Sequence, residues 1–175
     1  KDQNSLEELT YEGYAPAGVA VFVECLSDNS NRTVANIRAA FAKHGGSLGT
    51  NGSLSFIFDR KGIFTIPVSK IKNLDEFELE MIDEGAEDFE SDGTAIVLTS
   101  AFEDFGKISG KLDSMGIEPE SQELQRIPNN TIKLGIEDAR KVLRLIDRLE
   151  EDEDVQRVFH NLGMTDELMA MFENE

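Results

Sequence analysis

Short apolar runs alternate with helical stripes along the chain. Residues 17–26 form a β-branched apolar run, which predicts a buried strand. A turn rich in Asn and Ser follows, and residues 32–44 then place apolar side chains on one helical face. After the glycine pair at 45–46, which suits a helix end, residues 54–58 predict a second strand. This order predicts a βαβ unit with parallel strands and a right-handed crossover.

The middle of the chain has a different order of elements. Residues 62–127 read as β-α-β-β-α-β, the pattern of a ferredoxin-like domain. The expected strands are 63–68, 86–89, 94–99 and 117–127, and the expected helices are 74–84 and 102–115. The last part predicts an amphipathic helix at 136–150, a strand at 155–159 and a terminal helix at 165–172.

Together these elements predict an α+β fold with two α/β domains. We expect residues 6–61 and 131–175 to form one discontinuous α/β domain of the type βαβ…αβ. The ferredoxin-like domain, residues 62–130, is then inserted into it. No apolar run is long enough to span a membrane, so we expect no membrane partner.

Charge is unevenly distributed along the 175 residues, whose formal net charge is −18. Residues 1–62 carry six bases and seven acids, whereas 63–129 carry five and sixteen, and 130–175 carry six and twelve. Within residues 29–61 five bases stand against one acid. A chain this acidic should repel a polyanion as a whole, but this stretch is a local exception.

Signals for catalysis are poor, and we expect a non-enzymatic protein without cofactor or metal. The single cysteine, Cys25, lies in the apolar run and reads as a buried structural thiol. The two histidines, His44 and His160, lack the spacing partners of a zinc site. The glycine-rich stretch 45–53 follows a helix and lacks the Gly-Lys-Ser/Thr ending, so it is not a phosphate-binding P-loop.

The predicted βαβ unit suggests where nucleic acid would bind. It would bring the end of the first strand, the helix start and the end of the second strand to one edge, with the Gly-rich loop at the opposite edge. The candidates at the first edge are Asn29, Asn31, Arg32, Arg60 and Lys61, and those at the second are Lys43, His44, Thr50 and Asn51. Scattered solubilising charge is the alternative interpretation.

Three arginines of the predicted late helix share a face. Arg140, Arg144 and Arg148 follow at i, i+4 and i+8. Acids at helical spacings, Glu137, Asp147 and Glu151, make intrahelical ion pairs an equally good account of this pattern. Both interpretations stay open on the sequence alone.

Several short motifs resemble the YebC/PmpR family. The signature YEGYGPGGVA of that family is similar to YEGYAPAGVA at residues 11–20, where Ala15 and Ala17 are the departures. Further matching motifs are 28–29 (DN) with 31–33 (NRT), 41–46 (FAKHGG), 48–53 (LGTNGS), 58–62 (FDRKG), 84–88 (EGAED) and 127–129 (IPN). The resemblance covers essentially the whole chain.

This resemblance implies two α/β domains, one inserted into the other, and no catalytic residues. It also implies a basic, helical N-terminal domain, which is absent from this sequence; the start at Lys1 rather than Met fits that expectation. Bacterial members are cytoplasmic, DNA-binding transcriptional regulators, and a mitochondrial relative is a translational activator of a cytochrome c oxidase subunit. Other members are linked to ribosome function.

The leading expectation is therefore a cytoplasmic transcriptional regulator that binds DNA, mainly through the domain this sequence lacks. The first alternative is a ribosome-associated translation factor that binds ribosomal RNA. The second is a small-ligand-sensing module, because ferredoxin-like domains of this type often bind small molecules.

Overall fold

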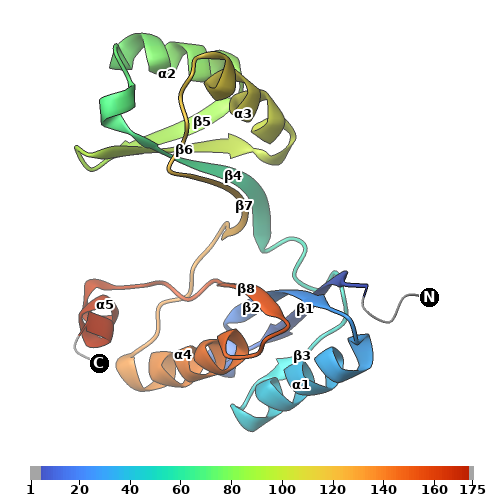
Figure 1. The fold of residues 1–175 in the computed structure, drawn as a ribbon. Coiled ribbons are helices and arrows are strands. Elements are labelled where there is room, and N and C mark those ends of the chain that lie inside the picture. The colour runs from blue at the N-terminus through green and yellow to red at the C-terminus, as the bar shows by residue number, and fades with distance from the viewer. Residues whose placement is uncertain (1–4, 174–175) are drawn as a thin grey trace. The chain divides into compact units, whose positions relative to one another are not determined.

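The computed structural model describes residues 5–173, which form two compact units (Figure 1). Unit 1 contains the residues up to Phe58 together with those from Pro128 onward, and unit 2 is Asp59–Ile127. Each unit has a four-stranded sheet with helices. The predicted α+β fold class is confirmed.

Unit 1 is built on the sheet β3-β1-β2-β8, in which every neighbouring pair is antiparallel. Its strands are β1 (Glu7–Tyr14), β2 (Ala20–Ser27), β3 (Ser47–Leu48) and β8 (Val155–His160). Its helices are α1 (Ser30–Lys43), α4 (Ile136–Glu150) and α5 (Asp166–Glu173), and a 3-10 turn, η1 (Pro16–Gly18), joins β1 to β2. The range of α4 is the predicted one, and Asn29 caps α1 by accepting a hydrogen bond from the Arg32 backbone N–H.

Both faces of β2 are buried, as its apolar run predicts. Val21, Val23 and Cys25 pack with α1 and α4 in the larger core. On the opposite face, Phe22 packs with Leu54 and Phe58. Burial of β2 on both sides makes it the centre of unit 1.

The predicted parallel βαβ unit is wrong. Residues 51–57 form turns rather than a strand, and the next strand, β4 (Phe58–Pro67), belongs to the sheet of unit 2. Leu54 packs against Phe22 from a turn. The short apolar run around it therefore reflects burial of a turn and not a strand, which periodicity alone cannot distinguish. The actual neighbours of β2 are β1, which the sequence did not predict, and β8.

Unit 2 has the element order expected of a ferredoxin-like domain. Its elements are β4, η2 (Val68–Lys70), α2 (Leu74–Asp83), β5 (Ala86–Ser91), β6 (Ala95–Ala101), η3 (Phe102–Asp104), α3 (Phe105–Ser114) and β7 (Ser121–Pro128). The strand order is β5-β6-β4-β7. Phe64 and Ile66 of β4 pack with Phe77 of α2 and Ile108 of α3 in a separate core. Within residues 5–173, no helix is both long and apolar enough to cross a membrane.

Candidate nucleic-acid interface

Arg32, the first predicted phosphate ligand, is tied to carboxylates of its own unit. Its Nε and Nη2 atoms donate to the Asp154 carboxylate at 3.2 and 2.8 Å, and Nη2 also donates to Asp28 at 3.0 Å. The Thr33 hydroxyl donates to the same Asp154 carboxylate at 2.9 Å. These bonds join the start of α1 to the segment that follows α4, so Arg32 has a structural role.

The surroundings of Arg32 are acidic. Asp28, Asp152, Glu153 and Asp154 line a shallow hollow of about 500 Å³ beside it. Hydrogen bonds from Arg32, and then from Thr33, hold the pKa of Asp154 below its usual value. A phosphate at this edge would therefore meet four carboxylates against two arginines, Arg32 and Arg148.

The pH dependence of unit 1 should report this ion pair. Because the folded-state pKa of Asp154 is lowered, its stabilising contribution is complete above the unfolded aspartate value of about 3.9. That contribution is lost as the pH falls through the folded-state pKa. We expect Asp154→Asn to lower the melting temperature at pH 7, measured by circular dichroism. Between pH 5 and pH 2 the melting temperature of the variant should fall less than that of the wild-type chain. An unchanged acid profile would contradict this role of Asp154.

Arg60 and Lys61 lie in unit 2, in β4. The Arg60 guanidinium carbon lies 4.5 Å from the ring centroid of Phe102, a cation–π contact. Lys61 donates to both oxygens of Glu87 at 2.8 and 3.0 Å. Because β2 and β4 belong to different sheets, Arg60 and Lys61 do not share a sheet edge with Arg32, Asn29 and Asn31.

At the second predicted edge, which carries Lys43, His44, Thr50 and Asn51, the backbones of β1 and β3 approach each other closely. A Cβ on Gly46 would lie 2.4 Å from the Tyr14 carbonyl oxygen, and one on Gly13 would lie 2.6 Å from the Ser47 carbonyl oxygen. β1 and β3 pair antiparallel at this point. Only glycine leaves room for these contacts. We call the surface formed by residues 14–18 and 43–52 the glycine end.

A buried carboxylate fixes the loop of the glycine end. Glu12 is 4% exposed, and its carboxylate accepts hydrogen bonds from the backbone N–H groups of Gly52 at 2.5 Å and Leu54 at 2.8 Å. Its carbonyl oxygen accepts a third from the Gly49 N–H at 2.8 Å. Sequence reasoning missed Glu12, because carboxylates are abundant in this chain and its partners lie about 40 residues away.

The glycine end presents the remaining candidates to solvent. Lys43, Thr50 and Asn51 are exposed, and His44 is half-buried at the C-terminal cap of α1. Both segments that carry them contact the end of β1. α1 contains three bases and no acid, and within residues 5–173 Lys43 forms no ion pair. The structure therefore brings together the second group of predicted residues.

Within the described part of the chain, no group of His, Cys, Asp and Glu side chains has the geometry of a metal site. Burial raises the pKa of the Cys25 thiol to about 12, with Asp152 and Asp154 adding to the effect. The thiol is therefore protonated at neutral pH and is not a nucleophile. Burial also lowers the pKa of His160, which favours its neutral form.

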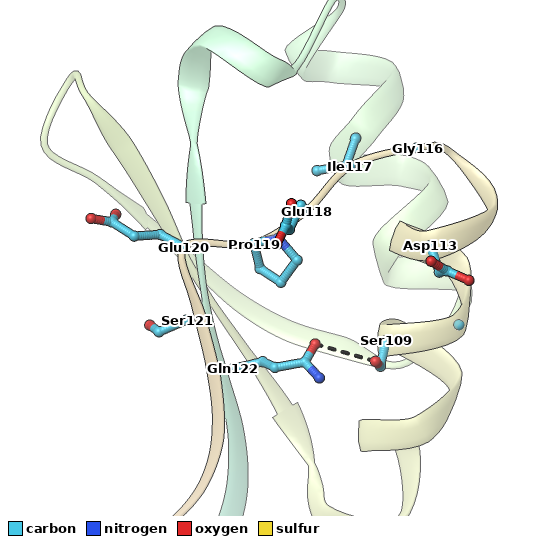
Figure 2. A pocket seen from close by; sticks show the side chains of 10 residues that line it. Ser109, Asp113, Gly116, Ile117, Glu118, Pro119, Glu120, Ser121 and Gln122 are labelled. Carbon is cyan, nitrogen blue, oxygen red and sulfur yellow. Dashed lines mark hydrogen bonds between the residues drawn. The ribbon is translucent and has the colours of Figure 1, made fainter.

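Unit 2 has an open groove of about 720 Å³ between α3 and the start of β7 (Figure 2). Ser109 donates a hydrogen bond to Gln122 across it at 3.2 Å. Asp113, Glu118 and Glu120 add carboxylates, while Ile117 and Pro119 are the main apolar contributors. Small-molecule sites have mostly apolar walls and a few converging polar groups. This lining therefore does not favour the ligand-sensing alternative.

Comparison with known proteins identifies the family of the chain. Residues 6–162 match the family model described as TACO1/YebC second and third domain. The chain belongs to the TACO1/YebC family. The TACO1/YebC segments 11–20, 41–46 and 48–53, which carried the resemblance in the sequence, lie at or next to the glycine end.

Several TACO1/YebC relatives carry the name "Probable transcriptional regulatory protein". One from Amoebophilus asiaticus is 48% identical over 164 residues, which cover 93% of this chain and 67% of the relative. One from Porphyromonas gingivalis is 47% identical over 162 residues, with the same coverage. One from Tolumonas auensis is 45% identical and covers 98% of this chain and 69% of the relative. The chain thus spans about two thirds of the length of these relatives.

A solved structure has the same fold. The crystal structure of the conserved hypothetical protein Aq1575 from Aquifex aeolicus matches with a TM-score of 0.79 and 34% identity. The match covers 97% of this chain and 70% of that one. The names of the TACO1/YebC relatives describe a regulatory role, in agreement with the expectation of a non-enzymatic protein.

Proposed function

We propose that this chain acts in a cytoplasmic regulator of gene expression, and that its glycine end contacts DNA. The proposal rests on one observation: the last turn of α1, which carries Lys43, is followed by a polar loop that the Glu12 carboxylate holds in place. Lys43 supplies a charge for phosphate, and Thr50 and Asn51 supply hydrogen-bonding groups. The names of the relatives support a role in regulation.

Charge limits the strength of this contact. With a net charge of −18, the chain as a whole repels a polyanion, so the contact depends on the local excess of bases. We therefore expect weak binding that falls steeply with salt, because each neutralised phosphate contributes about 0.9 to the salt slope.

A second candidate is ribosomal RNA, as expected of a translation factor. Among the unit 1 residues whose side chains are described, two aromatic side chains are exposed: Tyr14 is 37% exposed, and Phe56, in the turn after Leu54, is 74% exposed. Exposed aromatic rings stack on unpaired bases, which RNA loops offer and duplex DNA does not. Of the two, Tyr14 belongs to the glycine end, and its exposed ring favours RNA over duplex DNA at that surface.

Substitutions at the glycine end test the proposal. We expect Lys43→Gln combined with Asn51→Ala to weaken binding about 5- to 10-fold, because one phosphate contact and one polar contact are lost. Fluorescence anisotropy with duplex DNA and with single-stranded RNA, at matched low salt, measures both affinities. Tyr14→Ala should weaken RNA binding alone.

The matched control replaces Lys72 with Gln and Asn130 with Ala, two exposed residues outside the glycine end. This control should bind like the wild-type chain. Equal loss in both variants would contradict a localised interface. Promoter binding without ribosome co-sedimentation would contradict ribosomal RNA as the ligand. Ribosome co-sedimentation without promoter binding would contradict DNA as the ligand.

A further inference from the structure

A second basic surface lies on α4. Arg140, Lys141 and Arg144 are all exposed. They lie on the side of the helix away from its buried residues, which are Ala139, Val142, Leu145, Ile146 and Leu149. We call these three basic residues the arginine face. The two arginines are four residues apart, so they lie about 6 Å apart along the helix axis.

The intrahelical ion pairs that would explain these bases are not formed. Glu137 and Asp147 have suitable helical spacings to the arginine face. Yet the ion pairs found among residues 5–173 include none of Arg140, Lys141 and Arg144. These side chains are therefore available to a partner.

The arginine face lies at the same end of unit 1 as the glycine end. α1 and α4 lie side by side and run in opposite directions (Figure 1). The Arg32–Asp154 pair joins the start of α1 to the end of α4, and η1 lies against both α4 and Gly45. The last turn of α1, with Lys43, therefore lies toward the end of unit 1 at which α4 begins.

Arg148 differs from the other arginines on the helix. It lines the hollow that contains Asp28, Asp152, Glu153 and Asp154, so carboxylates offset its charge. It also lies in the last turn of α4, where a base complements the helix dipole. We leave Arg148 out of the arginine face.

We infer that the arginine face binds the phosphate backbone of the nucleic acid and extends the contact made by the glycine end. Guanidinium groups pair with phosphate oxygens through two parallel hydrogen bonds, which lysine cannot do. Such contacts hold the duplex or strand in position and carry no sequence information. The inference rests on the proposed function, because it assigns a further surface to the same ligand.

Removal of both arginines tests the inference. We expect Arg140→Gln combined with Arg144→Gln to weaken binding about 10-fold and to lower the salt slope by about 2. The probes are a 20-base-pair duplex and a single-stranded RNA of 20 nucleotides, titrated by anisotropy at several salt concentrations. Circular dichroism checks that α4 still folds.

The control combines Arg148→Gln with Lys72→Gln, which changes the net charge by the same amount. It should keep the wild-type salt slope. An equal effect of both variants, or none in either, would overturn the inference while leaving the glycine end as the interface. If the wild-type chain binds neither probe, the proposed function itself fails. A changed oligomeric state with unchanged nucleic-acid affinity would assign the arginine face to an acidic protein surface instead.

Discussion

The substitution Gly46→Ala is expected to lower the free energy of unfolding of unit 1 by about 3 kcal/mol. The added methyl group would lie 2.4 Å from the Tyr14 carbonyl oxygen and 3.3 Å from a ring carbon of Phe41. The oxygen belongs to the backbone of β1, which pairs with β3 there, and Phe41 is fully buried. Neither neighbour can move aside without loss of pairing or packing.

Tyrosine fluorescence during urea unfolding measures this effect in unit 1 alone. The chain has no tryptophan, and both of its tyrosines, Tyr11 and Tyr14, lie in β1. The control is Gly135→Ala, in the same unit, where a Cβ meets nothing within 4 Å. We expect it to cost less than about 1 kcal/mol. Equal stability of Gly46→Ala and the wild-type chain would contradict the close approach.

Loss of the Glu12 carboxylate is expected to have an effect of similar size. We expect Glu12→Ala to destabilise unit 1 by about 3 kcal/mol, because two backbone N–H groups lose a charged acceptor. The amides of Gly52 and Leu54 should also exchange hydrogen faster, since their partner is gone. The loop with Thr50 and Asn51 loses its fixed position, so nucleic-acid binding should weaken as well.

The matched control for Glu12 is Glu8→Ala. Glu8 lies on the same strand and the same face, but it is exposed. Its replacement should change the unfolding free energy by less than about 0.5 kcal/mol. If Glu12→Ala were as stable as Glu8→Ala, with unchanged exchange at Gly52 and Leu54, the loop would not depend on this carboxylate.

Periodicity predicted the regular part of the fold well. The β-branched run of β2, the apolar stripe of α4 and the element order of unit 2 each follow from local spacing. The strand predicted at 54–58 failed, because burial of Leu54 under Phe22 depends on a contact 32 residues away. β1 was not predicted, because most of its residues are polar. Only Leu9 and Tyr11 of this strand pack, partly buried, against the larger core.

The candidate site was predicted in part, and for a similar reason. The predicted βαβ unit grouped Lys43, His44, Thr50 and Asn51 at its second edge, and although that unit is wrong, these residues are close in sequence and stay together without it. Arg32 looked free because its main partner, Asp154, is 122 residues away. For the same reason the sequence left open whether the arginines of α4 pair with neighbouring acids.

Backbone amide NMR of the labelled chain, titrated with duplex DNA or single-stranded RNA at low salt, locates the surface that binds nucleic acid. We expect saturable shift changes at residues 43–51 and 140–144, and we expect these changes to become smaller as the salt concentration rises. Shift changes confined to unit 2, or to the acidic hollow beside Arg32, would contradict this expectation.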